Sequence, residues 1–144
     1  MPCLFCEIAA GRIPSQIVLE DDSSLTFLDN RPLFPGHCLL VPKLHVEVLS
    51  ELPTDQVGPL FQNAQILARA METGLAADGS FIAINNRISQ SVPHLHVHVV
   101  PRRKKDGLKG FFWPRNPYAS DQHSAEVLQK LQSAIAALRH QIKP

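Results

Sequence analysis

The sequence has no long apolar run, little net charge and few cysteines, and each shortage excludes a class of protein. No apolar stretch approaches the roughly 18 residues of a membrane-spanning helix. The net charge of +1 argues against an obligate nucleic-acid or anionic-membrane partner. The first residues lack a basic segment followed by an apolar one, so we expect no signal peptide. Three cysteines without a signal peptide indicate a reducing compartment, and we expect a cytoplasmic protein without a disulfide framework.

What is present is an ordinary globular composition. An apolar fraction of 44% and a charged fraction of 19% are typical of a folded soluble domain. A chain of 144 residues without internal repeats is long enough to bury a substantial core. We therefore predict one domain over residues 1–144.

Hydrophobic periodicity and turn residues predict an α+β fold, with a mainly antiparallel sheet, one long central helix and a C-terminal helix. Apolar residues at helical spacing support the two long helices. They are Val57, Leu60, Phe61, Ala64, Leu67, Ala68 and Met71 in the first, and Val127, Leu128, Leu131, Ile135, Leu138 and Ile142 in the second. The expected elements are a short helix at 2–10 stopped by Gly11, a hairpin of strands 17–20 and 25–29, a buried strand at 37–41, a helix capped by Thr54 or Asp55 and stopped by Gly74, a strand at 81–84, a loop at 85–92, a strand at 93–101 and a helix at about 124–141.

The predicted strand at 93–101 carries three histidines at alternate positions. Side chains at alternate positions of a strand point to the same face. His94, His96 and His98 would therefore share one side, while the apolar residues between them pack into the core and fix the register. On a helix the same three residues would splay around the axis.

Three interpretations of this strand remain open from the residues alone. The histidines could form an unremarkable polar face. They could bind a metal, because alternate strand residues can share one ion, and a zinc enzyme would use all three as ligands. One neutral imidazole could instead attack a phosphorus centre and carry a covalent intermediate, while its neighbours donate hydrogen bonds.

The stretch 90–100 resembles the signature of the histidine triad (HIT) superfamily, in which three histidines alternate with hydrophobic residues. The resemblance covers about residues 2–103, which we take as the core, and leaves a more variable tail and helix at 104–144. It implies a nucleotide hydrolase or transferase that is a homodimer and acts on nucleoside phosphoramidates, acyl-nucleotides or dinucleoside polyphosphates. Further matching segments are 4–8 with 11–14, 20–22 with 27–29, 35–37 with 40–45, and Asn85-Asn86.

The resemblance also implies catalytic roles. His96 matches the nucleophile that forms a nucleotidyl-histidine intermediate, and His98 matches the histidine that hydrogen-bonds the α-phosphate. Ser91 matches a hydroxyl that contacts the phosphate or the leaving group. His94 and His37 complete the candidate catalytic set.

The loop before the triad is expected to bind phosphate through backbone N–H groups, so catalysis would require no metal cofactor. Many relatives have a glycine-rich loop here, whereas this chain has Arg87-Ile88-Ser89. The candidate substrate-binding residues of the loop are Asn85, Ser89, Gln90 and Val92.

The resemblance assigns the nucleotide, expected to be a purine nucleotide or conjugate, to other residues. Asp29 matches a position that binds ribose hydroxyls, although a turn residue after a strand is the alternative. Phe5, Ile8 and Phe27, together with Leu4, match an apolar slot for the base, although plain core packing is the alternative.

A structural zinc site is predicted near the start of the chain. Cys3-x-x-Cys6 is a spacing that lets two thiolates bind one metal. Some histidine triad relatives combine such cysteines with a histidine after a Pro-Lys segment, here His45, and with the first triad histidine, here His94. The alternative is that the thiols only pack.

The tail and the biological role leave further alternatives. The basic segment 102–105 could be a solvated turn or could attract a polyanionic nucleotide. The aromatic cluster at 111–113 suggests core or dimer packing, or a base-stacking platform. A non-catalytic nucleotide-binding regulatory module is the rival to an enzyme, and neither the leaving group nor the base preference follows from the sequence.

Overall fold

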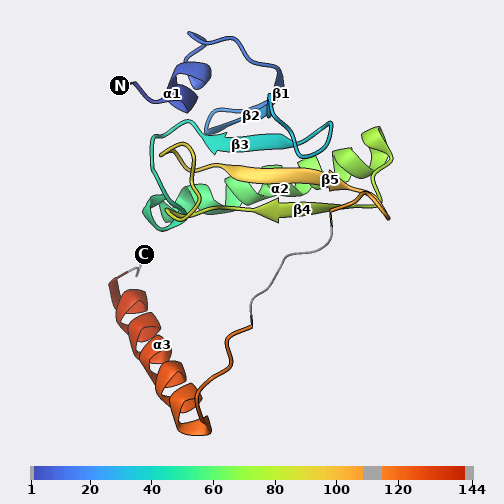
Figure 1. The fold of residues 1–144 in the computed structure, drawn as a ribbon. Helices are drawn as coiled ribbons and strands as arrows, with labels where there is room; N and C mark the ends of the chain where they lie inside the picture. The colour runs from blue at the N-terminus through green and yellow to red at the C-terminus, as the bar shows by residue number, and fades with distance from the viewer. Residues whose placement is uncertain (1, 109–114, 142–144) are drawn as a thin grey trace. The chain divides into compact units, whose positions relative to one another are not determined.

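The structure is a computed structural model that describes residues 2–108 and 115–141. It divides into two compact units, Met1–Gly107 and Leu108–Pro144, which we describe separately. The first unit contains the sheet and two of the helices, and the second contains one helix (Figure 1). No helix in the described ranges is both long and apolar enough to cross a membrane.

The first unit is built on a five-stranded sheet with the order β1-β2-β3-β5-β4. All neighbouring strands are antiparallel, which confirms the predicted α+β class. β3 and β5 are adjacent although far apart in sequence, and Leu39 pairs with His98 across them. The strands are β1 (Ile17–Glu20), β2 (Ser24–Leu28), β3 (Cys38–Pro42), β4 (Gly79–Ala83) and β5 (Val97–Arg102).

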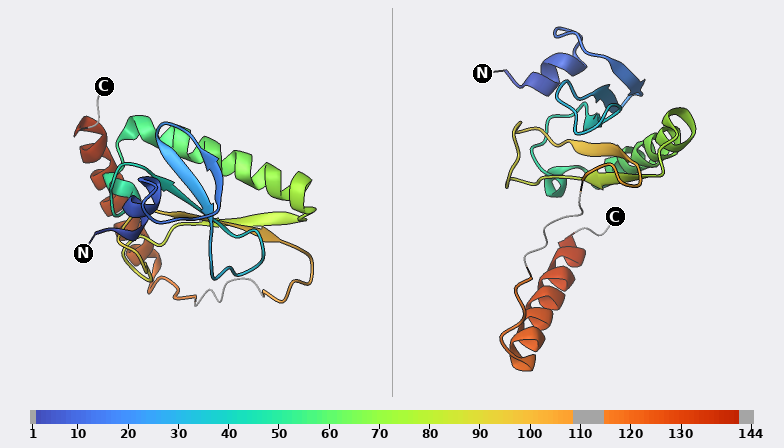
Figure 2. Two further views of the ribbon diagram at one scale, coloured as in Figure 1. Left: turned by 90° about the horizontal axis from the view of Figure 1, so that it is seen from above. Right: turned by 45° about the vertical axis from the view of Figure 1, so that its right-hand side comes forward.

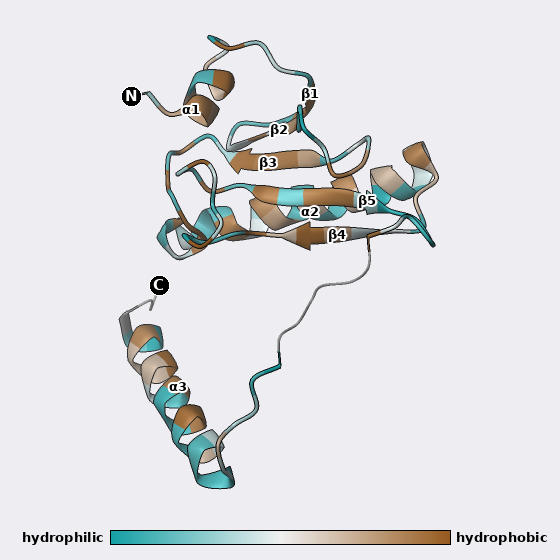
Figure 3. Ribbon diagram, in the orientation of Figure 1, coloured by the Kyte–Doolittle hydropathy of each residue, from teal (hydrophilic) through white to brown (hydrophobic). Residues whose placement is uncertain are grey.

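A helix packs on each side of this sheet. The long helix α2 (Thr54–Leu75) runs along one face (Figures 1 and 2), and the short helix α1 (Leu4–Ala9) packs against the other. Strand alternation produces these two layers: Leu40 of β3 faces α2, whereas its neighbours Leu39 and Val41 face α1. The central strands β3 and β5 are accordingly mostly hydrophobic (Figure 3).

The ends of α2 differ from the prediction. Neither Thr54 nor Asp55 caps the helix, because Pro53 has an extended backbone and the helix begins directly after it, without a side-chain cap. The helix also continues past Gly74. It ends where Ala76 adopts a left-handed conformation with φ 54°, which turns the chain so that the Ala77 N–H donates to the Met71 carbonyl at 3.1 Å.

Two further features of α2 are the exposure of Phe61 and the position of Pro59. Phe61 is 37% exposed, so it lies at the border of the apolar stripe and not within it. Pro59 lies inside the helix, beyond the first turn where proline is best tolerated. The core-facing residues are Leu60, Ala64, Leu67 and Met71, as the spacing predicted.

The histidine segment is only partly a strand. β5 begins at Val97, so the prediction of a strand over 93–101 is wrong for its first half. Pro93 has no N–H to donate, and the Leu95 N–H bonds the Val46 carbonyl of a loop at 2.7 Å. The predicted alternation survives nevertheless, because the apolar residues between the histidines are fully buried.

The second unit contains α3 (Asp121–Gln141), which begins earlier than the predicted Ser124 because the Ser120 hydroxyl accepts the His123 N–H. Its predicted apolar stripe is exposed in this unit. The expectations for 111–113 and for Ile142 lie outside the described residues. The exposed residues of the stripe are Leu128, Leu131, Ile135 and Leu138.

A buried polar contact joins α2 to the β1–β2 turn. The Asn63 amide donates to Asp21 Oδ2 at 2.7 Å and to Ser24 Oγ at 2.8 Å. The same hydrogen bond, with those from the N–H groups of Ser23 and Ser24, lowers the pKa of Asp21 to about 2. Asn63 is therefore the one described α2 side chain that satisfies this turn.

We expect Asn63→Ala to reduce the free energy of unfolding by about 1–3 kcal/mol, because a buried hydroxyl and a carboxylate lose their donor. Urea unfolding at pH 7 measures the loss, with Gln62→Ala on the exposed face of α2 as the matched control. The lowered pKa of Asp21 implies that the loss shrinks as the pH falls from 3.8 towards 2. Equal midpoints for the two variants would contradict this role.

Candidate active site

A cavity of about 480 Å³ brings together residues from four segments of the first unit. Pairing of β3 with β5 aligns His98 beside Leu39, and α1 covers the same side of the sheet. The cavity is lined by Leu4, Phe5, Asp29, Asn30, Arg31, Leu39, Ser91, Val92, His96 and His98. Of the sequence candidates, it thus unites the second and third triad histidines with Ser91, Val92, Asp29 and Phe5.

His96 has one ring nitrogen bound to the backbone and one available to react. Its Nδ1 lies 2.7 Å from the His94 carbonyl oxygen, which can only accept a hydrogen bond. Nδ1 therefore carries the proton, and the lone pair is on Nε2. The Phe5 ring packs edge-on against the imidazole with centroids 5.2 Å apart. His96 is 3% exposed, so the ring is fixed in place.

A chain of hydrogen bonds fixes the proton of His98 in the same way. The Leu33 N–H donates to His37 Nδ1 at 3.1 Å, which leaves the His37 proton on Nε2. His37 Nε2 in turn lies 3.0 Å from His98 Nδ1 and donates to it. His98 therefore carries its own proton on Nε2. The His98 ring lies 5.0 Å from that of His96, so this N–H is a donor beside the candidate nucleophile.

Burial favours the neutral form of three of the histidines. It lowers the pKa of His98 to about 4, with further lowering by His96 and His37, although Asp29 opposes the shift. Burial also lowers the pKa of His37 and of His94. Because a neutral imidazole has one donor and one acceptor, the hydrogen-bond chain from Leu33 to His98 is intact near pH 7.

Asp29 is a turn residue, and it also lines the cavities. Its Oδ1 accepts the Arg31 N–H at 2.9 Å, as a turn residue does. Its Oδ2 lies 3.7 Å from His37 Nε2, and the residue lines two cavities. Asp29, His37 and His98 lie close enough to hold a metal. The Leu33 N–H opposes this, because a neutral His37 that bound metal through Nε2 would need a proton on Nδ1.

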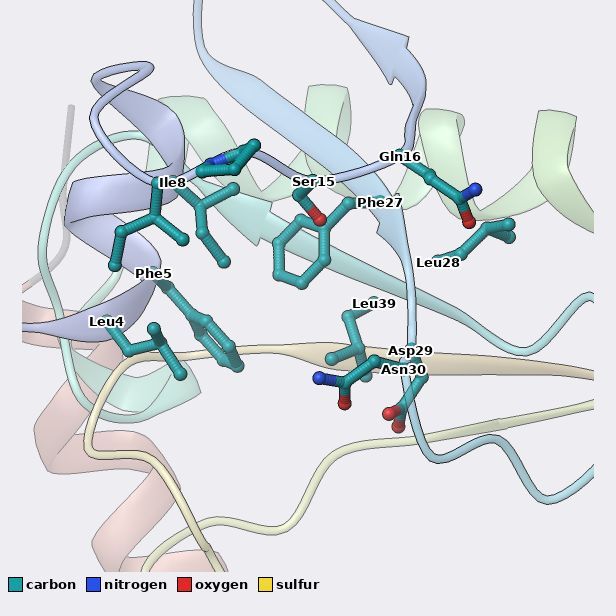
Figure 4. A pocket seen from close by; sticks show the side chains of 12 residues that line it. Leu4, Phe5, Ile8, Ser15, Gln16, Phe27, Leu28, Asp29, Asn30 and Leu39 are labelled. Carbon is teal, nitrogen blue, oxygen red and sulfur yellow. The ribbon is translucent and has the colours of Figure 1, made fainter.

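A second cavity, of about 310 Å³, adjoins the first and is mostly apolar (Figure 4). The rings of Phe5 and Phe27 meet edge to face in it, with centroids 5.3 Å apart. Phe5, Phe27 and Ile8 are also buried in the core. The core packing of these residues is therefore observed, and the same residues line an apolar cavity, so their role as a slot for the base stays a prediction. Several other residues that line this cavity were not predicted from the sequence. Among them only Leu39 carried a signal, which is the alternation of its strand. These residues include Ile13, Pro14, Ser15, Gln16, Asn30 and Leu39.

The loop before the triad is braced by its own side chains. Gln90 donates from Nε2 to the Glu47 carbonyl at 2.7 Å and accepts the Arg87 N–H on Oε1 at 2.8 Å. Its amide is thus engaged within the protein. Arg87 and Ser89 have φ angles of 67° and 59°, a region that favours glycine. Asn85 and Ser89 are exposed and are not among the described residues that line the His96 cavity.

The first triad histidine faces a different site. His94 Nε2 donates to the Pro42 carbonyl at 2.8 Å, so its lone pair is on Nδ1. That atom lies 3.2 Å from His45 Nδ1, 3.4 Å from Cys3 Sγ and 3.5 Å from Cys6 Sγ. A tetrahedral zinc site separates its nitrogen and sulfur ligand atoms by about 3.3–3.8 Å, from the usual bond lengths. The four predicted residues therefore fit a zinc ion.

This arrangement argues against a metal held by all three triad histidines. The two clusters with metal-binding geometry in the described ranges are the cysteine–histidine group and the Asp29 group. Each contains only one triad histidine, because neighbouring backbone groups turn the three rings to different partners.

Comparisons with known proteins agree with this geometry. The family model described as the HIT domain matches residues 10–105. Adenosine 5'-monophosphoramidase HNT1 of Saccharomyces cerevisiae is 33% identical over 92% of this chain and 84% of its own length.

Two solved structures are similar throughout the chain. SMU.412c from Streptococcus mutans UA159 has a TM-score of 0.83 and 38% identity, and the match covers 92% of this chain and 85% of that one. A zinc-bound histidine triad family protein from Mycobacterium smegmatis has a TM-score of 0.71 and 39% identity, covering 92% and 96%. The family match, the shared fold and the triad together establish that the chain belongs to the HIT domain family.

Proposed function

We propose that this protein is a hydrolase of nucleoside phosphoramidates that works through a covalent nucleotidyl–His96 intermediate. One observation carries the proposal: the His94 carbonyl holds the His96 proton on Nδ1 and leaves Nε2 with a free lone pair inside the cavity. The yeast relative named as an adenosine 5'-monophosphoramidase supports this substrate class.

The reaction has two displacements at the α-phosphorus. His96 Nε2 attacks phosphorus, a bond between nitrogen and phosphorus forms, and the bond to the leaving amine breaks as the amine nitrogen takes up a proton from solvent. The Nε2–H of His98 stabilises the phosphoryl oxygens, and the Ser91 hydroxyl contacts the leaving group or the phosphate. Water then attacks phosphorus and loses a proton to solvent, the bond between phosphorus and His96 Nε2 breaks, and the nucleotide is released with His96 restored. His37 acts as a positioning residue, because it holds the His98 proton on Nε2.

The two cavities accommodate the rest of the nucleotide. The base, which we take to be a purine, occupies the apolar cavity between Phe5, Ile8 and Phe27. Asp29 lies where both cavities meet, so its Oδ2 accepts ribose hydroxyls while Oδ1 keeps the Arg31 turn. Arg31 adds positive charge near the phosphate. Backbone N–H groups of residues 89–92 contribute further phosphate donors.

The charge of a third cavity favours an amine over a second nucleotide as the leaving group. This cavity, of about 590 Å³, shares Ser91 and Val92 with the His96 cavity. Among its described lining residues Glu47 is the one carboxylate, and none is lysine or arginine. A polyphosphate chain would be repelled there, whereas an amine or a cationic leaving group would not.

We further propose that Cys3, Cys6, His45 and His94 hold a structural zinc ion. When bound, the metal supplies a cross-link between α1 and the segment before β5, and His94 keeps its orientation. The zinc-bound relative from Mycobacterium smegmatis supports this proposal. The family resemblance also supports a homodimer through the sheet and α2.

We expect His96→Ala to abolish turnover of an adenosine phosphoramidate while AMP binding, measured by calorimetry, survives. The wild type should turn over at about 1 s⁻¹ or faster, a typical enzymatic rate. Mass spectrometry of a quenched wild-type reaction should locate a nucleotidyl adduct on His96. An adduct on another residue would refute the assignment, and AMP binding without turnover in the wild type would favour a regulatory module.

The third cavity predicts a preference that charge reversal should change. Adenosine phosphoramidates should have a higher kcat/KM than diadenosine polyphosphates. Glu47→Lys should shift the ratio towards the polyphosphate by roughly tenfold, equivalent to about 1.4 kcal/mol. Glu47→Gln separates loss of the carboxylate from gain of a cation. An unchanged ratio in both variants would show that this cavity does not hold the leaving group.

The lowered pKa of His98 predicts an acid-dependent loss of stability. Between pH 6.5 and about 4 the unfolded chain binds a proton that the folded chain does not, so the folded state becomes less stable as the pH falls. Relative to His98→Gln, the wild type should lose at most about 1.4 kcal/mol per pH unit in this interval. Urea unfolding at pH 7, 5.5 and 4 measures the difference, which would stay constant if His98 were not buried neutral.

A further inference from the structure

The attachment of α1 to the rest of the first unit depends on side chains. The backbone hydrogen bonds of its described residues stay within the segment 3–13. Two sets of side chains hold the helix in place: Phe5 and Ile8 pack into the core, and Cys3 and Cys6 face His94 and His45. The segment 3–6 is therefore fixed at both ends by thiols.

The residues between these thiols belong to the nucleotide site. Leu4 and Phe5 line both the His96 cavity and the apolar cavity. The Phe5 ring contacts the His96 imidazole directly. The contacts of the two cysteines with His94 and His45 therefore help to hold Phe5 over the candidate nucleophile.

The two thiols are close and accessible. Their Sγ atoms lie within 4.8 Å of each other, both residues are half-exposed, and both line the third cavity. Residues three apart at a helix start have Cβ atoms about 5–6 Å apart, a separation that a small adjustment closes to a disulfide. Cys38 differs, because it is buried in β3 and its thiol donates to the Gly36 carbonyl.

We infer that Cys3 and Cys6 are an oxidation site at which a hydroperoxide forms an intramolecular disulfide, releases the metal and weakens nucleotide binding. The inference rests on the proposed zinc and nucleotide sites. It gives the thiols a role beyond anchoring: they connect the redox state of the solution to the nucleotide cleft.

The oxidation is balanced. One thiolate sulfur attacks the peroxide, the O–O bond breaks, and a sulfenic acid forms with release of an alcohol, or of water from hydrogen peroxide, after uptake of a proton. The second thiolate attacks that sulfur, an S–S bond forms, and the S–O bond breaks to release hydroxide, which takes up a second proton. The two thiolates lose two electrons, which reduce the peroxide.

The product is a poor metal site. Disulfide sulfurs carry no negative charge, so His94 and His45 alone remain as ligands. The attachment of α1 is then reduced to Phe5 and Ile8. The position of Phe5 over His96 then depends on its core packing alone, so the wall that Phe5 gives to both cavities is held less firmly.

The test uses the full-length reduced protein loaded with zinc and treated with hydrogen peroxide. We expect about one zinc per chain in a chelating-dye assay, as one site with four ligands requires. Peptide mass spectrometry should find a Cys3–Cys6 disulfide and a free Cys38 thiol. Calorimetry with AMP should show a fall in affinity of roughly tenfold or more, about 1.4 kcal/mol. Dithiothreitol and zinc should restore it.

Two variants separate the site from general oxidative damage. Cys38→Ser should respond to peroxide as the wild type does, because the Ser hydroxyl can keep the bond to Gly36. Cys6→Ala should have an AMP affinity that peroxide does not change, whatever its starting value. A peroxide response that persists in Cys6→Ala would overturn the inference.

The remaining outcomes distinguish this inference from the function on which it rests. Absence of AMP binding in the reduced protein refutes the proposed function, and the inference with it. A zinc content well below one per chain refutes the metal site and, with it, the release of metal; the thiol switch on nucleotide binding is then upheld only by a fall in AMP affinity after oxidation. A Cys3–Cys6 disulfide with unchanged AMP affinity overturns the inference and leaves the proposed function standing.

Discussion

Backbone groups decide which nitrogen of each imidazole carries the proton, and the rest of the site depends on this constraint. The carbonyls of Pro42 and His94 each accept from one ring, and the Leu33 amide donates to another. A carbonyl cannot donate and an amide cannot accept, so each ring has one available tautomer at neutral pH. The buried residues between the histidines fix the register, and the register fixes these backbone groups.

The same constraint divides the triad between two tasks. His94 turns its lone pair towards the cysteines, whereas His96 and His98 serve the cavity on the other side of Phe5. Helix α1 stands between the two, since its thiols reach one site and its apolar side chains line the other. Helix α1 and its N-cap Cys3 thereby connect the proposed metal site with the proposed nucleotide site.

Alternation was sufficient to predict the sheet class, the core residues of the histidine segment and the shared location of His96 and His98. It did not predict that β5 begins only at Val97, because the hydrogen bond from Leu95 to a distant loop carbonyl leaves no periodic trace. The sequence also did not predict the Leu33–His37 hydrogen bond or the hydrogen bonds of the Gln90 amide, because they too leave no periodic pattern. Lining residues from irregular segments, such as Gln16 and Asn30, follow no period at all.

The loop that carries Ser91 is held in its conformation by side-chain hydrogen bonds, whereas a glycine-rich loop would adopt the same conformation through the backbone freedom of glycine. Arg87 and Ser89 hold left-handed backbone conformations that cost each of them about 1–2 kcal/mol relative to glycine. The Gln90 amide holds the loop against that strain. A loop that is restricted in this way has few conformations to lose when a ligand binds. Most of its conformational entropy is therefore already lost during folding. The cost of a restricted loop at the candidate site is thus borne by the stability of the unliganded protein instead of by the affinity for a ligand.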